Sequence, residues 1–155
     1  MALWYDETFA DHTRFGLRVK ETLFSEQSRY QKVEVIDTVG FGRVLVIDDV
    51  LMTSEYDEFL YHEMLAHPAL VTAPRIDRVL VIGGGDGGTV REVMRHPDVR
   101  ECVMIEIDEL VVRASKRFLP GIGTAWDDPR LDLRFVDAVE YLNKSDDEKY
   151  DVILL

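Results

Sequence analysis

A glycine-rich turn that contains one acid is the segment of this chain best suited to ligand chemistry. Five of the six residues from Gly83 to Gly88 are glycine, and the sixth is Asp86. The turn follows the apolar run Val79–Ile82 and precedes a segment with helical character, a pattern of strand, tight turn and helix start. In α/β folds a nucleotide or adenosyl ligand lies close to the backbone at such a turn. The candidate backbone contacts are Gly83, Gly85 and Gly87.

Acidic residues follow the next two apolar segments of the chain. Glu106 lies near the end of segment 101–107, about 20 residues after the turn, where a ribose hydroxyl pair finds its acceptor. Asp108 lies beside it, and Asp137 follows segment 131–136. Because ligands bind at the carboxyl ends of parallel strands, we expect all three acids to lie near the turn.

The charge of Asp86 distinguishes between classes of ligand. A dinucleotide phosphate would be repelled by this carboxylate, which weighs against an NAD site. An adenosyl donor of the S-adenosylmethionine type fits better, with Glu106 on the ribose and Asp137 on the adenine edge. Loss of the donor's own carboxylate removes a repulsion and leaves an ammonium that Asp86 can pair. The alternative is that the turn is only a turn and that each acid is a solvated strand or helix end.

Composition restricts the class of protein. The 155 residues carry a formal charge of −12, which argues against nucleic-acid and anionic-membrane surfaces and permits a cationic substrate. Hydrophobic content of 46% and charged content of 31% are typical of a globular chain. Because no apolar run has the length of a membrane span and the start lacks a signal peptide, we expect a cytoplasmic protein. Cys102 lies in an apolar segment and is expected to be a buried, reduced thiol, and we expect no metal.

Residues 1–53 are predicted to form a small antiparallel sheet. Segments 16–24 and 30–38 alternate apolar and polar side chains, as half-buried strands do. Gly40–Gly42 and Asp48-Asp49 are predicted turns that lead into strands 43–47 and 50–53.

A helix is predicted after the sheet. Ser54–Asp57 has the form of a capping box in which Ser54 caps the amide of Asp57. Tyr61 and His62 lie off the centre of the apolar stripe, where they can reach a neighbouring cleft. Pro68 is predicted to break or restart the helix, with a domain boundary near residue 73. The predicted apolar stripe consists of Tyr56, Phe59, Leu60, Met64 and Leu65.

The remaining residues alternate between strand and helix patterns. The predicted strands are 78–82, 101–107, 131–136 and 151–155, and the predicted helices are 88–96, 109–118 and a short one from Ala138. Continuous apolar strands need cover on both faces, so we predict a doubly wound, Rossmann-like parallel sheet of at most four strands. The expected fold class is α/β, with an antiparallel β domain (1–53), a connecting helix (54–73) and a Rossmann-like, class I methyltransferase-like domain (74–155). Because the last strand lies at the chain end, we expect a truncated chain or one completed by a partner segment.

Several motifs in the same order resemble those of the spermidine synthases, the polyamine aminopropyltransferases. The strongest are Thr53–Leu65, Gly83–Gly88 with Arg91–Val93, and Glu106–Asp108. The resemblance extends to the last residue through Trp4-Tyr5, Ser28–Gln31, Phe41-Gly42, Asp128–Arg130 and Asp137-Ala138.

This resemblance implies transfer of an aminopropyl group from decarboxylated S-adenosylmethionine, a co-substrate, to a diamine such as putrescine. The products would be spermidine and methylthioadenosine, no separate cofactor would be needed, and the protein would be a dimer or tetramer. Tyr61, together with Asp86, would belong to the diamine site. The implied donor contacts are Gln31, His62, Asp86, Glu106, Asp137 and Ala138.

The resemblance also implies that the proton acceptor lies beyond this chain. In the family an aspartate follows directly after a segment like Tyr150–Leu155 and acts as the base on a loop that closes over the site, whereas Leu155 is the last residue here. We therefore expect no catalytic residue in the chain and no activity from it alone. Two smaller departures are Asp49 where glycine is usual and Met52 where glutamine is common. The rival hypotheses are a methyltransferase that uses the same donor fold and a non-catalytic protein for nucleoside binding or assembly.

Overall fold

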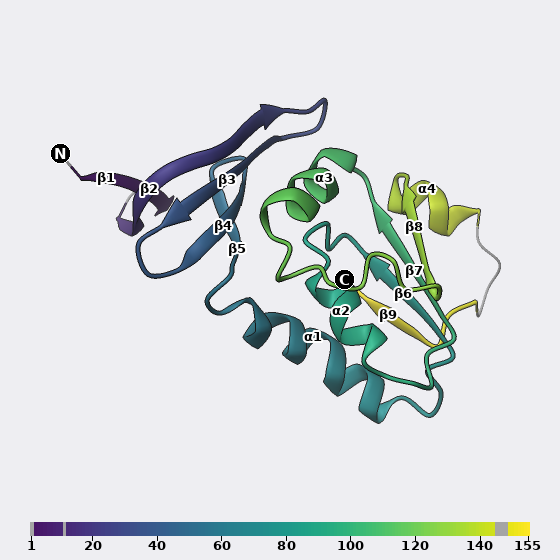
Figure 1. Cartoon of the computed structure of the whole chain (residues 1–155). Helices are drawn as coiled ribbons and strands as arrows, with labels where there is room; N and C mark the ends of the chain where they lie inside the picture. Colours follow the sequence, from purple (N-terminus) through teal and green to yellow (C-terminus); the bar gives the residue numbers. More distant parts are fainter. Residues whose placement is uncertain (1, 11, 145–148) are drawn as a thin grey trace.

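The described residues form two β-sheets joined by one long helix (Figure 1). The computed structural model describes residues 2–10, 12–144 and 149–155. An antiparallel sheet from the first third of the chain lies beside a parallel sheet from the rest, and helix α1 runs beneath both in Figure 1. The predicted α/β fold class, with an antiparallel sheet ahead of a Rossmann-like one, is confirmed.

The antiparallel sheet is a five-stranded meander in the order β1-β2-β3-β4-β5. The hairpin between the last two strands turns at Asp48 and Asp49, whose φ angles of 46° and 67° are both left-handed. Such a turn matches the twist of the flanking strands. The strands are β1 (Leu3–Phe9), β2 (Thr13–Gln27), β3 (Lys32–Thr38), β4 (Gly42–Ile47) and β5 (Val50–Ser54).

Helix α1 (Glu58–Thr72) differs from its prediction in three ways. The Ser54 hydroxyl donates to the Asp57 carboxylate (2.6 Å) instead of capping its amide, and Asp57 itself stands at the N-cap position without a side-chain cap. Pro68 lies inside a continuous helix, because one proline removes a single ladder bond and packing sustains the rest. The predicted apolar stripe is not the buried face: Tyr56, Phe59, Leu60 and Met64 are exposed. The buried face instead carries His62, Ala66 and Leu70.

The parallel sheet has four strands among the described residues, in the order β8-β7-β6-β9. The chain runs outward from β6 through β7 to β8 and then returns to β9, so the strand order reverses beside β6. Ligands bind at such a switch point. The strands are β6 (Arg78–Ile82), β7 (Glu101–Glu106), β8 (Leu131–Phe135) and β9 (Val152–Leu154), and the helices are α2 (Gly88–Met94), α3 (Glu109–Phe118) and α4 (Ala138–Asn143).

Two sets of buried side chains cover the faces of the parallel sheet. Helices α1 and α2 pack on one face through Ala66, Leu70, Val90 and Val93. Helix α4 packs on the opposite face, where Ala138 and Tyr141 contact a cluster of Leu80, Val103 and Ile105. Both faces of the inner strands β6 and β7 are therefore covered, as expected. The same expectation is wrong for β9, where Ile153 is 54% exposed. Cys102 is fully buried, which raises the pKa of its thiol to about 12.

A third core joins the two sheets. Val33, Val35 and Leu45 of the antiparallel sheet pack against Leu110 and Val111 of α3. Apolar burial between α3 and the antiparallel sheet therefore holds the two sheets together, and α1 connects them along the chain. In the part of the chain that the structure describes, none of the helices is both long and apolar enough for a membrane crossing.

The β4–β5 turn generates a stability prediction. Asp49 is left-handed and its side chain is largely exposed, so Asp49→Gly should raise the free energy of unfolding by about 0.5–1 kcal/mol. Asp48→Gly is the control, because Asp48 also accepts a hydrogen bond from the Lys32 amide (2.8 Å) and its loss should cancel the gain. Chemical denaturation of the three proteins measures this. A loss of stability for Asp49→Gly would contradict the interpretation.

Candidate ligand-binding site

A cavity of about 290 Å³ lies at the carboxyl end of β6, where the two sheets meet α1. The antiparallel sheet supplies its apolar wall through Leu45, Ile47 and Met52, and the glycine turn supplies its polar floor. Seven of the predicted site residues line it: Gln31, Tyr61, His62, Gly83, Gly85, Asp86 and Glu106. The cavity is large enough and apolar enough for a nucleoside-sized ligand with a few polar contacts.

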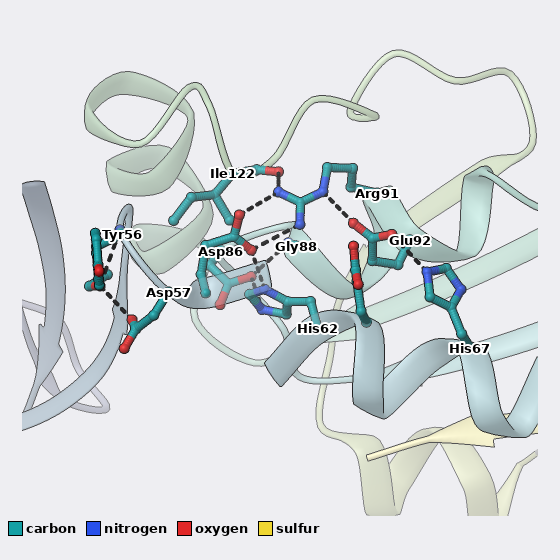
Figure 2. Close-up of polar contacts among 12 residues, drawn as sticks. Tyr56, Asp57, His62, His67, Asp86, Gly88, Arg91, Glu92 and Ile122 are labelled. Atoms are coloured by element: carbon teal, nitrogen blue, oxygen red, sulfur yellow. Dashed lines mark hydrogen bonds and ion pairs between the residues drawn. The ribbon is translucent and has the colours of Figure 1, made fainter. Parts of the chain in front are cut away.

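Asp86 is the acidic group of the glycine turn, and its carboxylate is held from two sides. The Gly88 amide donates to Oδ1 (2.7 Å), and His62 Nε2 lies 3.3 Å from the same oxygen (Figure 2). About 13% of the Asp86 side chain remains exposed, whereas His62 is 1% exposed. The carboxylate is therefore fixed in position but open to the cavity, as an anchor for a cationic ligand must be.

His62 is buried between two carboxylates. Its Nδ1 lies 2.6 Å from Glu58 Oε2, one turn earlier on α1, and its Nε2 faces Asp86. Burial opposes a charge on the ring, but the hydrogen bonds and attraction from Asp86 and Glu58 outweigh it and raise the pKa of His62. The ring also requires a glycine on α2, because a Cβ at Gly88 would lie 2.3 Å from it.

Arg91 forms an ion pair with Glu58. Its guanidinium donates to both Glu58 oxygens (2.8 and 2.9 Å). It also donates to the Ile122 carbonyl (3.0 Å), and its Nε pairs with Glu92 (Figure 2). These bonds raise the pKa of Arg91, so its positive charge is permanent. When His62 is protonated, charges of alternating sign run from Arg91 through Glu58 and His62 to Asp86.

Glu106 is a second carboxylate of the cavity, and it is 8% exposed. Burial raises its pKa, while hydrogen bonds from backbone amides, among them that of Asp108 (3.0 Å), oppose the shift. A buried carboxylate that lines the cavity at the end of β7 can accept hydrogen bonds from a hydroxyl pair.

Asp137 and Ala138 line a neighbouring hollow of about 260 Å³. Gly83 and Glu106 line both hollows, so the two are adjacent. The Asp137 side chain accepts from the Glu140 amide (2.9 Å) as the cap of α4.

Two predicted contacts, Asp108 and Gly87, line neither hollow. Asp108 is 3% exposed, caps α3 through the Leu110 amide (3.0 Å) and accepts from the Ser28 hydroxyl (2.7 Å). Gly87 is left-handed (φ 82°) and lies against Trp126, whose ring leaves no room for a Cβ. Asp108 thus fixes the fold around the cavity, and Gly87 shapes the turn.

Glu58 and Arg91 are the site residues that sequence reasoning missed as functional groups. The spacing of Glu58 and His62 was a usable signal, since residues four apart lie on one helix face. Arg91 has no comparable signal, because only the packing of α2 on α1 brings it to Glu58.

One cluster outside the cavity has the composition of a metal site. Glu63, His67 and Glu92 offer ligand atoms within 4.8 Å of one another. However, Arg95 pairs with both acids (2.7 Å to Glu92 and 3.5 Å to Glu63), and Arg91 also binds Glu92. Because these guanidiniums already compensate the carboxylates, we assign no metal to this cluster.

Comparison with protein families matches the chain in two parts. Residues 58–155 match the family described as "Spermine/spermidine synthase domain", and residues 3–55 match "Spermidine synthase tetramerisation domain". The chain is 48% identical over 155 residues to the polyamine aminopropyltransferase of Thermoanaerobacter pseudethanolicus, covering all of this chain and 56% of that protein. It is 44% identical over 153 residues to that of Bacillus subtilis, covering 99% of this chain and 55% of the relative. The chain therefore spans little more than half the length of these relatives.

Solved structures of spermidine synthases are also similar to this chain. The spermidine synthase from Thermotoga maritima superposes with a TM-score of 0.94 at 37% identity, over 98% of this chain and 53% of that one. A spermidine synthase in complex with the transition state analogue AdoDATO also superposes with a TM-score of 0.94 at 37% identity, over 98% of this chain and 52% of that one.

Glu106 generates a prediction in which stability and binding move in opposite directions. Glu106→Gln should raise the free energy of unfolding at pH about 7 by on the order of 1 kcal/mol, because no charge is then buried. Since the folded pKa is raised, this gain should shrink as the pH falls through that raised pKa and should be absent at and below the ordinary value of 4.5. The same change should weaken binding of adenosine, measured by calorimetry, because an amide is the poorer acceptor.

Glu109→Gln is the matched control for this prediction. Glu109 is exposed in the first turn of α3, so its neutralisation should bring no gain in stability. A Glu106→Gln protein that is less stable than the parent at neutral pH would refute the assigned cost of burial.

Proposed function

The chain belongs to the spermine/spermidine synthase family, and we propose that it binds decarboxylated S-adenosylmethionine for aminopropyl transfer to a diamine such as putrescine. Methylthioadenosine is the product that would leave. The observation that supports this most strongly is Asp86, a fixed carboxylate that faces the cavity from within a glycine turn. An ammonium without a neighbouring carboxylate is the ligand group that such a site attracts.

The adenosyl part of the donor would lie along the ends of the parallel strands. We place the ribose at Glu106 and the adenine edge at Asp137 and Ala138, because the two adjacent hollows share Glu106 and Gly83. Gln31 lines the same cavity from the segment before β3, where its amide can both donate and accept. We propose that the donor is consumed as a co-substrate and that no separate cofactor takes part.

The transfer step would be an in-line displacement by an amine. A neutral nitrogen attacks the carbon next to the sulfonium, the carbon–sulfur bond breaks, and its electron pair stays on sulfur. Tyr61, which lines the cavity on the α1 side, would position the incoming amine. The attacking amine must also lose a proton. Because Asp86 and Glu106 are engaged with the donor, we propose that the proton acceptor is not one of them.

The assembly is also a proposal. The name of the family that matches residues 3–55 supports a homo-oligomer, either a dimer or a tetramer. Large apolar side chains are exposed on the first strands, as a protein–protein interface requires: Leu3, Trp4, Phe9 and Phe15.

Asp86→Asn tests the proposed function. The amide keeps the shape of the side chain but removes the charge, so decarboxylated S-adenosylmethionine should bind about 10–100-fold more weakly. Methylthioadenosine has no ammonium and should change by less than about 3-fold, which makes it the internal control. Isothermal titration calorimetry gives both constants. Equal losses for the two ligands would remove the role of Asp86 and, with it, the main support for this donor.

A further inference from the structure

Asp86 lies beside an imidazole that can carry a positive charge. His62 Nε2 lies 3.3 Å from Asp86 Oδ1, and this imidazole is 1% exposed. When the ring is protonated, both of its nitrogens donate and neither can accept a hydrogen bond. An incoming ammonium then meets a carboxylate that a neighbouring positive charge partly neutralises.

Glu58 stabilises the protonated form of His62. Its carboxylate lies 2.6 Å from Nδ1 and is 9% exposed, and Arg91 fixes it with two hydrogen bonds. Glu92 and Arg95 form an ion pair of their own beyond Arg91 (2.7 Å). With the ring protonated, the charges of Arg91, Glu58, His62 and Asp86 sum to zero, and with the ring neutral these four residues leave one negative charge to meet a cation.

The groups that face His62 come from each element packed against it. Helix α1 contributes Glu58 and the ring of Tyr61, whose centroid lies 5.2 Å from that of the imidazole. The glycine turn contributes Asp86. Helix α2 contributes the backbone at Gly88 directly and Arg91 through its bonds to Glu58.

We propose that binding of an alkylammonium at Asp86 is coupled to release of the Nε2 proton of His62, whose protonated ring Glu58 stabilises from the Nδ1 side. A hydrogen bond of about 2.8 Å to either Asp86 oxygen places the ammonium nitrogen within about 8 Å of Nε2, so the two cations repel each other in a buried setting. Loss of the Nε2 proton removes this repulsion and turns Nε2 into an acceptor for an ammonium N–H.

The proton balance of this step is simple. The N–H bond at Nε2 breaks, its electron pair stays on the ring, the proton passes to buffer, and the Nδ1 proton remains donated to Glu58. The ligand ammonium keeps its own protons, because its pKa lies far above that of an imidazole. Glu58 is thus a positioning residue, since it acts on the ammonium-binding carboxylate of Asp86 only through His62. This inference rests on the proposed function, because it takes the donor's ammonium to bind at Asp86.

Calorimetry in buffers of different ionisation enthalpy counts the protons released. The titrations use the unaltered chain at pH values that span about two units on either side of 6.5, the ordinary pKa of histidine. Decarboxylated S-adenosylmethionine should release about half a proton or more per ligand at the maximum. Methylthioadenosine, which lacks the ammonium, should release at least about 3-fold less at the same pH.

Glu58→Gln separates this role from a merely structural one. The amide keeps the size of the side chain but not its charge, so the maximum of proton release should move to lower pH. At the pH of the original maximum the release should fall at least about 3-fold. Glu63→Gln, one residue beyond His62 on the same helix, makes the same charge change but contacts Arg95 instead, and should leave the profile unchanged.

The outcomes distinguish this inference from the proposed function. If decarboxylated S-adenosylmethionine binds and no proton is released at any pH in the series, the coupling is overturned and the proposed function stands. If neither adenosyl ligand binds, both fail. Because the comparison of the two ligands needs no variant, it decides the inference even where Glu58→Gln does not fold.

Discussion

The buried imidazole of His62, held between Glu58 and Asp86, is the interaction on which the site depends. It links the helix that joins the two sheets to the glycine turn at the end of β6. Glycine at position 88 allows the approach, and Arg91 supplies the charge that makes a second buried carboxylate tolerable. Removal of one of these four side chains would leave an uncompensated buried charge. Together they therefore hold one another in position and balance the buried charges.

The walls of the cavity depend on burial between the two sheets. Val33, Val35 and Leu45 pack on α3, and the Ser28 hydroxyl bonds to Asp108 at the start of that helix. Asp108 therefore contributes by holding the segment before β3, which carries Gln31, against the parallel sheet. Asp108 was a natural candidate for a ligand contact because it lies close to Glu106, yet its carboxylate accepts hydrogen bonds from the Leu110 amide and the Ser28 hydroxyl instead.

The sequence predicted the architecture well where local signals are strong. Strand 78–82 and helix 109–118 have the predicted bounds, because a continuous apolar strand and an amphipathic helix with an aspartate cap are local patterns. The face of α1 was predicted wrongly because that helix is apolar on two sides, and periodicity does not tell which side meets the sheet. Ser54 failed as the cap because the helix begins only at Glu58, with Asp57 at the N-cap position; the Ser54 hydroxyl donates to Asp57 and accepts from the Tyr56 amide. The support of His62 by Arg91 is a tertiary contact between two helices, and no spacing in the sequence reports it.

The central claim is that Asp86 makes this cavity a binding site for an amine-bearing adenosyl donor that has lost its carboxylate. Titration of the unaltered chain with decarboxylated S-adenosylmethionine and with S-adenosylmethionine, side by side in one buffer, tests it most directly. The decarboxylated donor should bind at least about 10-fold more tightly, because the carboxylate of the other would lie near Asp86. Equal affinity, or tighter binding of S-adenosylmethionine as expected for a methyltransferase, would contradict the claim.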